Sequence, residues 1–406
     1  MRKMKDSGID IVGEMPSEWD LIRLRYLVKI TTGDSDTQDA DPDGIYPFYV
    51  RSPIVERSSS YTFNGEGILM AGDGAGAGRI FHHAFGKYAV HQRVYRLFDF
   101  KINSNFLFYF ISNLFPSVMD KGSAQSTVPS VRLPMLQNFE VCQPPLPEQK
   151  KIADFLDAKC ADIDQIRADI EKQIEILTDY KKSVITEAVT KGLDPKAKMK
   201  NSGIEWIGKI PEHWDVHPLY YYFGERKHKN VLGEEKNLLS ISYGKIIRKN
   251  IDSKEGLLPE NFNGYNIIEK DDIVMRLTDL QNDKRSLRTG LVKEHGIITS
   301  AYVTLKAKRD LSAVYFHYLL HCYDLLKVLY NMGNGVRQGL NFSELSRMML
   351  IEPSIVEQKA IADYLDEKCS EIEATIAEKQ KQLETLEEYK KSLIFEYVTG
   401  KKEVPT

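Results

Sequence analysis

The chain of 406 residues has few of the features that mark secreted, membrane or metal-binding proteins. No apolar run approaches the ~20 residues that span a bilayer, and the polar N-terminus has no signal-peptide stretch, so we expect a cytoplasmic protein without membrane contact. Only four cysteines are present and none forms a Cys-x-x-Cys pair, which argues against disulfides and metal sites and favours small buried residues. They are Cys142, Cys160, Cys322 and Cys369.

Motifs of the common nucleotide-dependent and DNA-modifying enzymes are also lacking. The chain has no Gly-Lys-Ser/Thr phosphate loop and no Asn/Asp-Pro-Pro-Tyr/Phe string of amino-methyltransferases. No group of carboxylates suggests a nuclease. His82, His83 and His91 are not accompanied by cysteines or carboxylates at the spacing of a known metal site, so surface or hairpin histidines are favoured. We therefore predict no catalytic residue and no metal ligand in this chain.

Glycine is concentrated between Gly72 and Gly78. This run raises the hypothesis of an enzyme that binds a nucleotide here and merely dimerises through its helices. A dinucleotide or phosphate-binding turn must open a helix, whereas strand-forming residues follow at Arg79–Phe81. The pattern therefore favours a glycine-rich hairpin. A coiled-coil scaffold without any role in DNA binding is a further alternative.

The chain contains a long internal duplication. Residues 148–190 align without a gap with residues 357–399, and 24 of the 43 pairs are identical, which exceeds what shared helical composition produces. Residues 4–20 likewise align with residues 199–215, at an offset of 195 instead of 209. The sequences between the repeated segments differ, and the second is 14 residues longer (209 minus 195). A repeated frame therefore carries two different inserts, which lie in residues 20–147, counted from the last aligned residue Asp20, and 216–356.

The net charge of -3 hides an uneven distribution. The first insert is neutral, with 12 basic and 12 acidic residues, and the second carries +4, with 20 and 16. The repeated segments 148–190 and 357–399 are acidic, at -3 and -5. This distribution fits two inserts that can face phosphate, held by helices that repel it, and it excludes a uniformly basic DNA coat.

Each copy of the 43-residue segment predicts one long helix, of about 65 Å at ~1.5 Å per residue. Apolar residues recur every seven positions, which makes a seam for a partner helix. Ordinary amphipathic helices on two globular domains are the simpler alternative, but length and duplication favour an antiparallel coiled coil between the two copies. The predicted seam consists of Leu156, Ile163, Ile170, Leu177, Tyr180, Val184, Leu365, Ile372, Leu386, Tyr389 and Leu393.

Both inserts have the pattern of mixed strands, turns and helices, in a matching layout with different loops. Such a layout is typical of two recognition surfaces of different specificity. Arg, Lys, Asn and Gln can contact base edges, and Ser, Thr and main-chain amides serve phosphates, although strand-surface charges are an equal alternative. The DNA-binding candidates are Arg79, His82, Lys87, Gln92, Arg93, Arg96, Lys121, Ser123, Gln125 and Ser126 in the first insert, and Lys245, Arg248, Arg276, Gln281, Asn282, Lys284, Arg285, Arg288, Asn334, Arg337 and Gln338 in the second.

The predicted fold class is α+β, with two mixed α/β domains separated by two long helices that form an antiparallel coiled coil, in a pseudo-twofold internal repeat. The expected boundaries are 1–146 for the first domain and 147–192 for the first long helix. Residues 193–352 form a linker and the second domain, and residues 353–406 form the second long helix and a C-terminal tail.

These features resemble the specificity subunit of Type I restriction-modification systems. The resemblance rests on the paired Ser-Gly-Ile and Pro-x-x-Trp segments, the doubled Glu-Gln-Lys-x-Ile-Ala-Asp helix starts and the doubled Tyr-Lys-Lys-Ser helix ends, and it covers essentially the whole chain. The hairpin at Asp73–Arg79 resembles one found in many recognition domains of that family, and the second insert departs from it.

The resemblance implies a non-catalytic DNA sequence-specificity subunit. Its two domains would be target-recognition domains, each reading one half of a bipartite target in double-stranded DNA. The helical pair would set the spacer and dock two methyltransferase subunits, and restriction subunits would join the full complex. No cofactor is implied for this chain, since S-adenosylmethionine, ATP and Mg²⁺ would be bound by the partner subunits.

Overall fold

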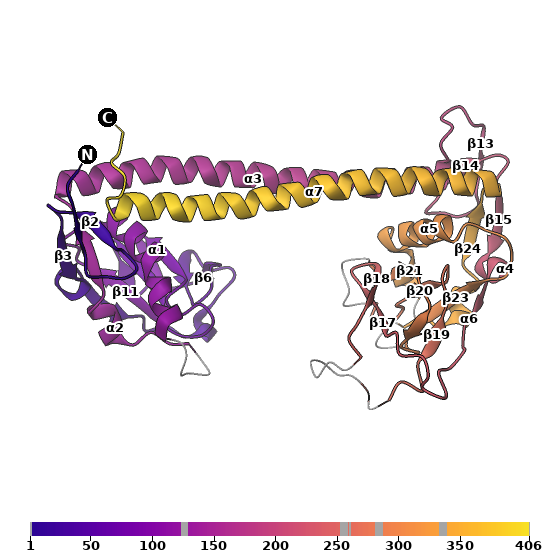
Figure 1. Ribbon diagram of the computed structural model, residues 1–406, viewed down its shortest axis with the longest axis horizontal. Coiled ribbons are helices and arrows are strands. Elements are labelled where there is room, and N and C mark those ends of the chain that lie inside the picture. Colours follow the sequence, from indigo (N-terminus) through magenta and orange to yellow (C-terminus); the bar gives the residue numbers. More distant parts are fainter. Residues whose placement is uncertain are drawn as a thin grey trace. The chain divides into compact units, whose positions relative to one another are not determined.

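The computed structural model describes residues 2–122, 129–251, 259, 261–280, 287–332 and 339–405, with residues 121, 122 and 331 described by their backbone alone. The chain divides into two compact units (Figure 1). Unit 1 contains residues Met1–Glu171 and Gln380–Thr406, and unit 2 contains residues Lys172–Lys379. The division cuts through both long helices, so each unit contains part of each helix and both ends of the chain belong to unit 1. None of the described helices is long and apolar enough to cross a membrane.

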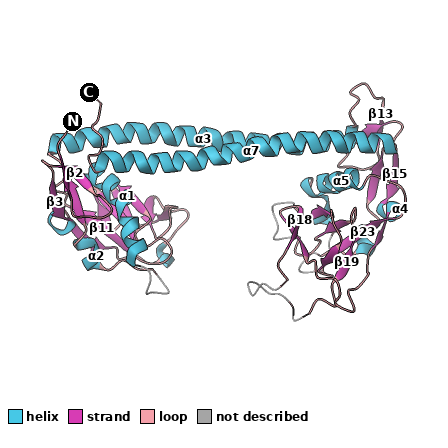
Figure 2. Ribbon diagram, viewed as in Figure 1, coloured by secondary structure: helices cyan, strands magenta, loops and turns pink. Residues whose placement is uncertain are grey.

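The two long helices are α3 (Leu146–Lys191) and α7 (Ile355–Val398) (Figure 2). They pack antiparallel in both units, because contacts that advance along α3 move backwards along α7. In unit 1, Lys390 contacts Asp164 at 2.7 Å and Glu387 contacts Arg167 at 3.5 Å. In unit 2, Lys181 contacts Glu373. At the repeat offset of 209, Lys181 corresponds to Lys390 and Glu373 to Asp164, so the same ion pair occurs in both units. The predicted α+β fold with an antiparallel helix pair is confirmed.

The predicted seam is buried at most of its positions and exposed at two. Tyr180 and Tyr389 are exposed to 55% and 54%, so neither lies in the seam. The next residue in each copy, Lys181 or Lys390, faces the partner helix instead, and one residue along a helix turns the side chain by about 100°. Leu177 and Leu386 are half-buried. The buried members are Leu156, Ile163, Ile170, Val184, Leu365, Ile372 and Leu393.

Unit 1 is built around a four-stranded antiparallel sheet in the order β4-β11-β8-β9. A second, mixed sheet has the order β6-β5-β10-β7, in which β5 and β10 run parallel. The elements of unit 1 before α3 are β1 (Met4–Asp6), β2 (Glu14–Pro16), β3 (Asp20–Arg23), η1 (Leu24–Tyr26), β4 (Lys29–Thr32), η2 (Thr37–Asp39), β5 (Tyr46–Tyr49), β6 (Glu56–Ser58), β7 (Phe63–Asn64), β8 (Gly67–Ala71), β9 (Phe81–Ala84), β10 (Lys87–Val90), β11 (Val94–Phe98), α1 (Ser104–Gly122), α2 (Leu133–Gln137) and β12 (Glu140–Gln143).

Unit 2 has a four-stranded antiparallel sheet of the same strand order, β16-β23-β20-β21. The matching layout predicted for the two inserts is therefore present in their main sheets, although the insert sequences share little identity. The elements of unit 2 outside the long helices are β13 (Met199–Asn201), β14 (Lys209–Pro211), β15 (Asp215–Pro218), α4 (Leu219–Tyr222), β16 (Phe223–Glu225), β17 (Leu239–Ser242), β18 (Lys245–Arg248), β19 (Asn266–Ile268), β20 (Ile273–Met275), β21 (Thr289–Leu291), β22 (Gly296–Ile298), β23 (Val303–Ala307), α5 (Ala313–Leu325), η4 (Val328–Asn331), α6 (Phe342–Leu345) and β24 (Met349–Glu352).

The repeated Glu-Gln at the start of each long helix joins that helix to its unit. In unit 1, the Trp19 indole N–H donates to the Glu148 carboxylate at 3.1 Å. The buried Gln149 accepts from the Asn103 amide at 2.8 Å and donates to the Pro144 carbonyl at 2.7 Å. These contacts satisfy backbone groups that would otherwise be buried without a partner.

Unit 2 repeats this arrangement. The Trp214 indole N–H donates to Glu357 at 3.3 Å. Gln358 accepts from the Ser312 amide and donates to the Pro353 carbonyl, each at 2.9 Å. The Glu-Gln motif that revealed the duplication therefore has a structural role. Its glutamate binds a buried tryptophan, and its glutamine binds the backbone of the insert.

Candidate nucleic-acid interface

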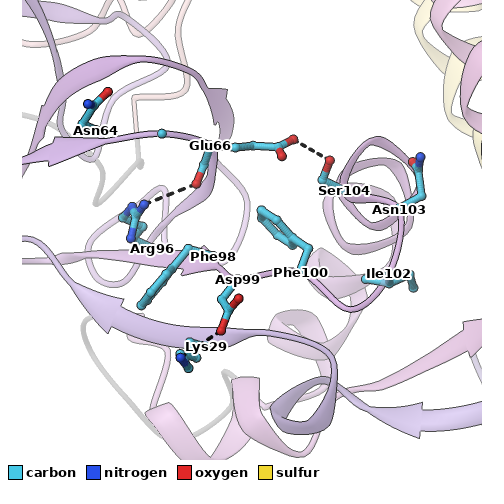
Figure 3. A pocket seen from close by; sticks show the side chains of 11 residues that line it. Lys29, Asn64, Glu66, Arg96, Phe98, Asp99, Phe100, Ile102, Asn103 and Ser104 are labelled. Carbon is cyan, nitrogen blue, oxygen red and sulfur yellow. Dashed lines mark hydrogen bonds and ion pairs between the residues drawn. The ribbon is translucent and has the colours of Figure 1, made fainter.

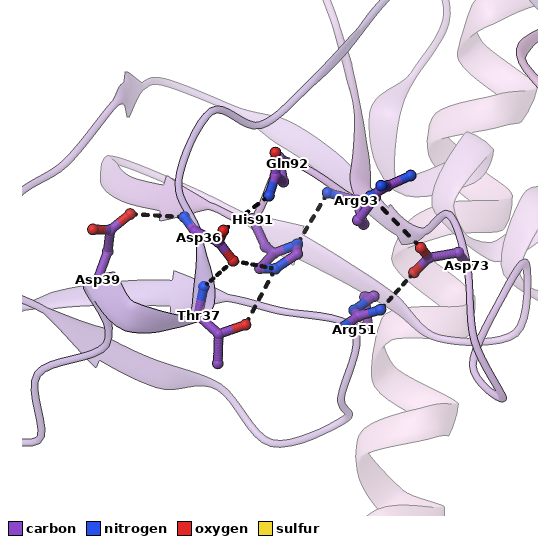
Figure 4. A network of polar contacts seen from close by, with 8 residues as sticks. All are labelled: Asp36, Thr37, Asp39, Arg51, Asp73, His91, Gln92 and Arg93. Carbon is purple, nitrogen blue, oxygen red and sulfur yellow. Dashed lines mark hydrogen bonds and ion pairs between the residues drawn. The ribbon is translucent and has the colours of Figure 1, made fainter.

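In unit 1, a turn of residues 91–93 joins β10 to β11 and presents two exposed polar side chains, Gln92 and Arg93 (Figure 4). Neighbouring segments hold its backbone on both sides. The Gln92 amide donates to the Ser35 carbonyl at 2.8 Å, and the Gly72 amide donates to the Arg93 carbonyl at 2.8 Å. A β-carbon at Gly72 would lie 2.8 Å from that carbonyl oxygen, so only glycine permits this approach.

The buried side chain of His91 supports the turn from inside. Its Nδ1 accepts from the Arg93 amide at 3.0 Å, and its Nε2 lies 3.4 Å from the Thr37 hydroxyl and 3.6 Å from the Asp36 carboxylate. Because Nδ1 acts as an acceptor, the proton of the neutral ring belongs on Nε2. Burial lowers the pKa of His91, which favours this neutral form at physiological pH.

Two carboxylates contact the exposed side chains of the turn. Asp36 accepts from the Gln92 amide group at 3.1 Å. Asp73 accepts from Arg51 Nη1 at 2.9 Å, and its other oxygen lies 3.8 Å from Arg93 Nε. The Arg93 side chain remains 65% exposed, so this contact orients the guanidinium group without removing it from solvent.

The glycine-rich segment beside the turn is a hairpin loop. Strands β8 and β9 pair antiparallel on either side of it, from Gly67 opposite Ala84 to Met70 opposite Phe81. The prediction of a glycine-rich hairpin is therefore confirmed, and the helix that a nucleotide-binding turn would open is replaced by strand β9.

The other described candidates of the first insert fall into three settings. Arg79 is exposed and contacts Asp120 at the end of α1 at 2.5 Å. The Lys87 ammonium group lies over the Tyr61 ring at 4.6 Å from its centroid. His82 is half-buried, donates to the Ser52 carbonyl at 3.0 Å, and has its pKa lowered by burial. Arg79 and Lys87 remain available on the surface.

Arg96 requires a correction, since it is 7% exposed and belongs to the interior of the sheet. Its guanidinium group lies between the rings of Phe63 and Phe98, at 4.7 and 4.3 Å, and its Nε donates to the Tyr88 hydroxyl at 2.9 Å. The sequence-based prediction of a DNA contact is wrong for this residue because aromatic packing takes up the faces of its guanidinium.

Arg96 also lines an open pocket of about 700 Å³ between β7, β11 and the start of α1 (Figure 3). Its charged and polar groups are paired with one another: Lys29 contacts Asp99 at 2.8 Å, and the Ser104 hydroxyl donates to Glu66 at 2.5 Å. Arg96 Nη2 donates to the Glu66 carbonyl at 3.3 Å. These contacts support the loops around the pocket.

Unit 2 has a turn of the same construction between β22 and β23. The Ala301 amide donates to Thr299 Oγ1 at 3.3 Å, as the Arg93 amide donates to His91 Nδ1. The Tyr302 amide donates to the Thr299 carbonyl at 3.3 Å, which matches the bond from Val94 to His91 at 2.9 Å. Ser300 and Ala301 are exposed and occupy the places of Gln92 and Arg93. The two units therefore share a backbone turn and differ in what it presents.

Arg288 also requires a correction, because it is completely buried in unit 2. Its Nη1 donates to the carbonyls of Arg276 and Thr278 at 3.0 and 2.8 Å, and its Nη2 donates to the Asp279 carbonyl at 3.0 Å. The guanidinium group lies 5.4 Å from the Tyr330 ring centroid. Arg288 therefore organises the backbone after β20 and has no exposed surface for DNA.

The remaining described candidates of the second insert differ in exposure. Lys245 is 70% exposed and contacts Glu373 of α7 at 3.1 Å, and Arg248 is 72% exposed and paired with Glu294. Arg276 is half-buried. The rest of the predicted residues lie outside the described side chains: Lys121, Ser123, Gln125, Ser126, Gln281, Asn282, Lys284, Arg285, Asn334, Arg337 and Gln338.

Sequence reasoning missed the residues that orient the turn. Asp36, Arg51 and Asp73 come from three separate loops and meet only in the folded unit. The sequence does contain one signal, since His91 directly precedes Gln92 and Arg93, but a histidine in a strand pattern does not reveal its partners. Among the described residues, no group of three or more His, Cys, Asp or Glu side chains could hold a metal ion.

Comparisons with known proteins agree with this architecture. Residues 16–176 match the family described as Type I restriction modification DNA specificity domain. The chain is 27% identical over 420 aligned positions to the type I restriction enzyme MjaVIII specificity subunit of Methanocaldococcus jannaschii, covering 95% of this chain and 93% of that protein. It is 28% identical over 190 residues to the type I restriction enzyme EcoDI specificity subunit of Escherichia coli, covering 47% of this chain and 42% of that protein.

A solved structure also shares the fold. The chain superposes with a TM-score of 0.68 and 12% identity on a chain from a structure that describes complex assembly of the type I R-M system, covering 96% and 99% of the two chains. The repeated helices and the common strand order of the two units agree with these matches. The chain is similar to the specificity subunits of type I restriction-modification systems over almost its whole length.

Proposed function

We propose that each unit reads one half of a bipartite target in double-stranded DNA. The observation that carries this proposal is the pair of equivalent turns, which present Gln92 and Arg93 in unit 1 and Ser300 and Ala301 in unit 2. One backbone scaffold with two sets of side chains suits two readers of different sequences. The chemistry of methylation and restriction, with S-adenosylmethionine, ATP and Mg²⁺, then belongs to partner subunits in the cytoplasm.

Exchange of residues 20–143 for the corresponding insert of another specificity subunit is expected to change one half of the methylated sequence and leave the other half intact. The reason is that this insert contains the sheets and turn of unit 1 but none of unit 2. The measurement is adenine-methylation sequencing of a host genome that expresses the full gene set. Exchange of residues 216–352 is the matched experiment and should change the opposite half. A change in both halves after either exchange would contradict independent reading.

We further propose that α3 and α7 set the spacer between the half-sites and dock two methyltransferase subunits. The helices carry exposed apolar side chains, which suit a protein partner: Ile166 and Tyr389 in unit 1, exposed to 47% and 54%, and Ile176 and Tyr180 in unit 2, exposed to 58% and 55%. Their acidic charge argues against direct contact with phosphate.

Insertion of seven residues into both helices, after Ile174 and after Leu383, is expected to lengthen the spacer by about three base pairs. These positions are equivalent in the repeat. Seven residues keep the apolar seam in phase and add about 10 Å at ~1.5 Å per residue, against ~3.4 Å per base pair. Methylation sequencing should report unchanged half-sites with a longer gap. Insertion into only one helix is the control and should abolish methylation, because the partner seams no longer match. An unchanged gap in the double insertion would refute the role in spacing.

A further inference from the structure

The turn of residues 91–93 has the construction of a base-reading element. Resting on the proposed function, we infer that Gln92 and Arg93 are specificity-determining residues that contact neighbouring base pairs in the major groove, Gln92 an adenine and Arg93 a guanine. Asp36 and Asp73 are their positioning residues. The bond from the Val94 amide to the His91 carbonyl at 2.9 Å closes a turn with Gln92 and Arg93 as its two central residues. Their Cα atoms are ~3.8 Å apart, close to the ~3.4 Å rise of DNA.

The backbone under the two side chains is rigid. The turn is bonded to Ser35 on one side and Gly72 on the other, both at 2.8 Å, and the buried His91 fixes the Arg93 amide from beneath. A base can be distinguished by hydrogen bonds only when the reading group is held within a fraction of an ångström. A turn clamped at three points satisfies that requirement, whereas a free surface loop does not.

Gln92 is oriented as an adenine reader needs it to be. A carboxylate can only accept, so Asp36 holds the NH₂ end of the side-chain amide at 3.1 Å and thereby fixes which end is which. Among the described residues, neither its second N–H nor its carbonyl oxygen has a partner. These two groups are the donor and acceptor that match N7 and N6 of adenine.

Arg93 is oriented in a corresponding way. It approaches Asp73 through Nε at 3.8 Å, and no described residue is paired with its two terminal nitrogens. The terminal nitrogens form the fork that donates to O6 and N7 of guanine. Asp73 is in turn fixed by Arg51 at 2.9 Å, so the carboxylate is a defined anchor.

The charge around the turn favours contact with bases over contact with phosphates. Asp36, Asp39 and Asp73 surround Arg51 and Arg93, so the network is net negative. A phosphate-binding surface is strongly basic, and its contacts carry no sequence information. The carboxylates close to Gln92 and Arg93 repel phosphate groups at every DNA sequence. Hydrogen bonds to complementary bases then determine which sequence the unit binds.

Unit 2 presents Ser300 and Ala301 on its equivalent turn, and neither can form the bidentate contacts described for Gln92 and Arg93. The inference therefore applies to one half of the target only. This asymmetry supplies the test: changes at the unit 1 turn must relax one half-site at two neighbouring positions and leave the other half-site as it was.

The experiment uses the full chain expressed with its methyltransferase and restriction partners, and adenine-methylation sequencing of the host genome as the readout. Gln92→Ala is expected to reduce discrimination at one A·T pair by roughly 5- to 150-fold, and Arg93→Ala to do the same at an adjacent G·C pair. Arg93→Lys should retain partial preference for guanine and also shows whether the turn tolerates substitution. Arg23→Ala removes an exposed arginine of the same unit, on β3, and should leave the motif unchanged.

The roles of Asp36 and Asp73 are tested by identifying the base position at which each substitution lowers specificity. Asp36→Ala should relax the position read by Gln92 and keep the guanine, and Asp73→Asn should do the reverse. A merely structural role would lower methylation at all sites without altering the motif. Unchanged base preferences in Gln92→Ala and Arg93→Ala, or a uniform loss of methylation in both and in Arg93→Lys, would overturn the inference. If exchange of residues 20–143 still changes one half-site in that case, the proposed function stands without it.

Discussion

Replacing Arg288 by alanine is expected to lower the free energy of unfolding of unit 2 by about 3 kcal/mol or more, because each of three buried acceptors left unsatisfied costs about 1–3 kcal/mol. The side chain is completely buried and donates to three carbonyls, those of Arg276, Thr278 and Asp279, at 2.8–3.0 Å. Its removal leaves these acceptors without the guanidinium in a site closed to water, and each lost partner adds a desolvation penalty. The effect is structural, so the first half of the DNA target should still be recognised.

Denaturant unfolding followed by tryptophan fluorescence measures this effect, because Trp206 and Trp214 belong to unit 2 and Trp19 to unit 1. Arg248→Ala is the matched control: the side chain is 72% exposed and paired with Glu294, so its loss should leave the free energy of unfolding nearly unchanged. Equal destabilisation by the two substitutions would contradict the structural role of Arg288. The residue would then again be a candidate for an exposed DNA contact.

The contrast between Arg288 and Arg93 shows which part of the site could be predicted from sequence. Each arginine directly precedes a strand, β11 for Arg93 and β21 for Arg288. From residue type alone, both have the same potential to contact DNA. What separates them is the environment: three main-chain carbonyls enclose one, and a single carboxylate 3.8 Å away leaves the other exposed. Such partners come from distant segments, so no local pattern encodes them.

The long helices were predictable because their information is local. A seven-residue apolar period defines a helix and its seam without knowledge of the rest of the chain. The seven-residue period predicted exposed residues as buried only at Tyr180 and Tyr389. At both places the next residue, a lysine, forms an ion pair with the partner helix, and the tyrosine side chain points outward. The matching strand layout of the two inserts was predictable. The shared hydrogen bond of the two turns was not, because His91 and Thr299 use different side chains to form it.

Acidification is expected to destabilise unit 2 through two histidines of α5. Burial is the main cause that lowers the pKa of both His317 and His321 to about 4, from an ordinary value of 6.5. His317 faces Asp366 and Lys293, and His321 faces His317 and Lys181, so the nearby cations add to the effect of burial on His321. In the described structure the Nε2 atom of His317 is buried without a hydrogen-bond partner.

The sign follows from proton linkage. Below pH 6.5 the unfolded chain binds protons at both histidines and the folded unit does not, so stability is full above pH 6.5 and falls as the pH drops towards about 4. At pH 5 the loss is on the order of 2 kcal/mol per histidine. His295 acts in the opposite direction, because its hydrogen bond to Glu269 raises its pKa, and its contribution is present in acid and lost as the pH rises.

Urea unfolding of the double variant His317→Asn, His321→Asn at pH 7 and pH 5 tests this expectation. The variant should lose much of the decline in stability between the two values, because about two protons no longer distinguish the folded from the unfolded state. His228→Asn replaces an exposed histidine of the same unit and should keep the decline of the unaltered protein. If the double variant declines as steeply as that control, the two half-buried histidines do not cause the acid sensitivity, and the Glu373 carboxylate, which is paired with Lys181 and Lys245, becomes its source.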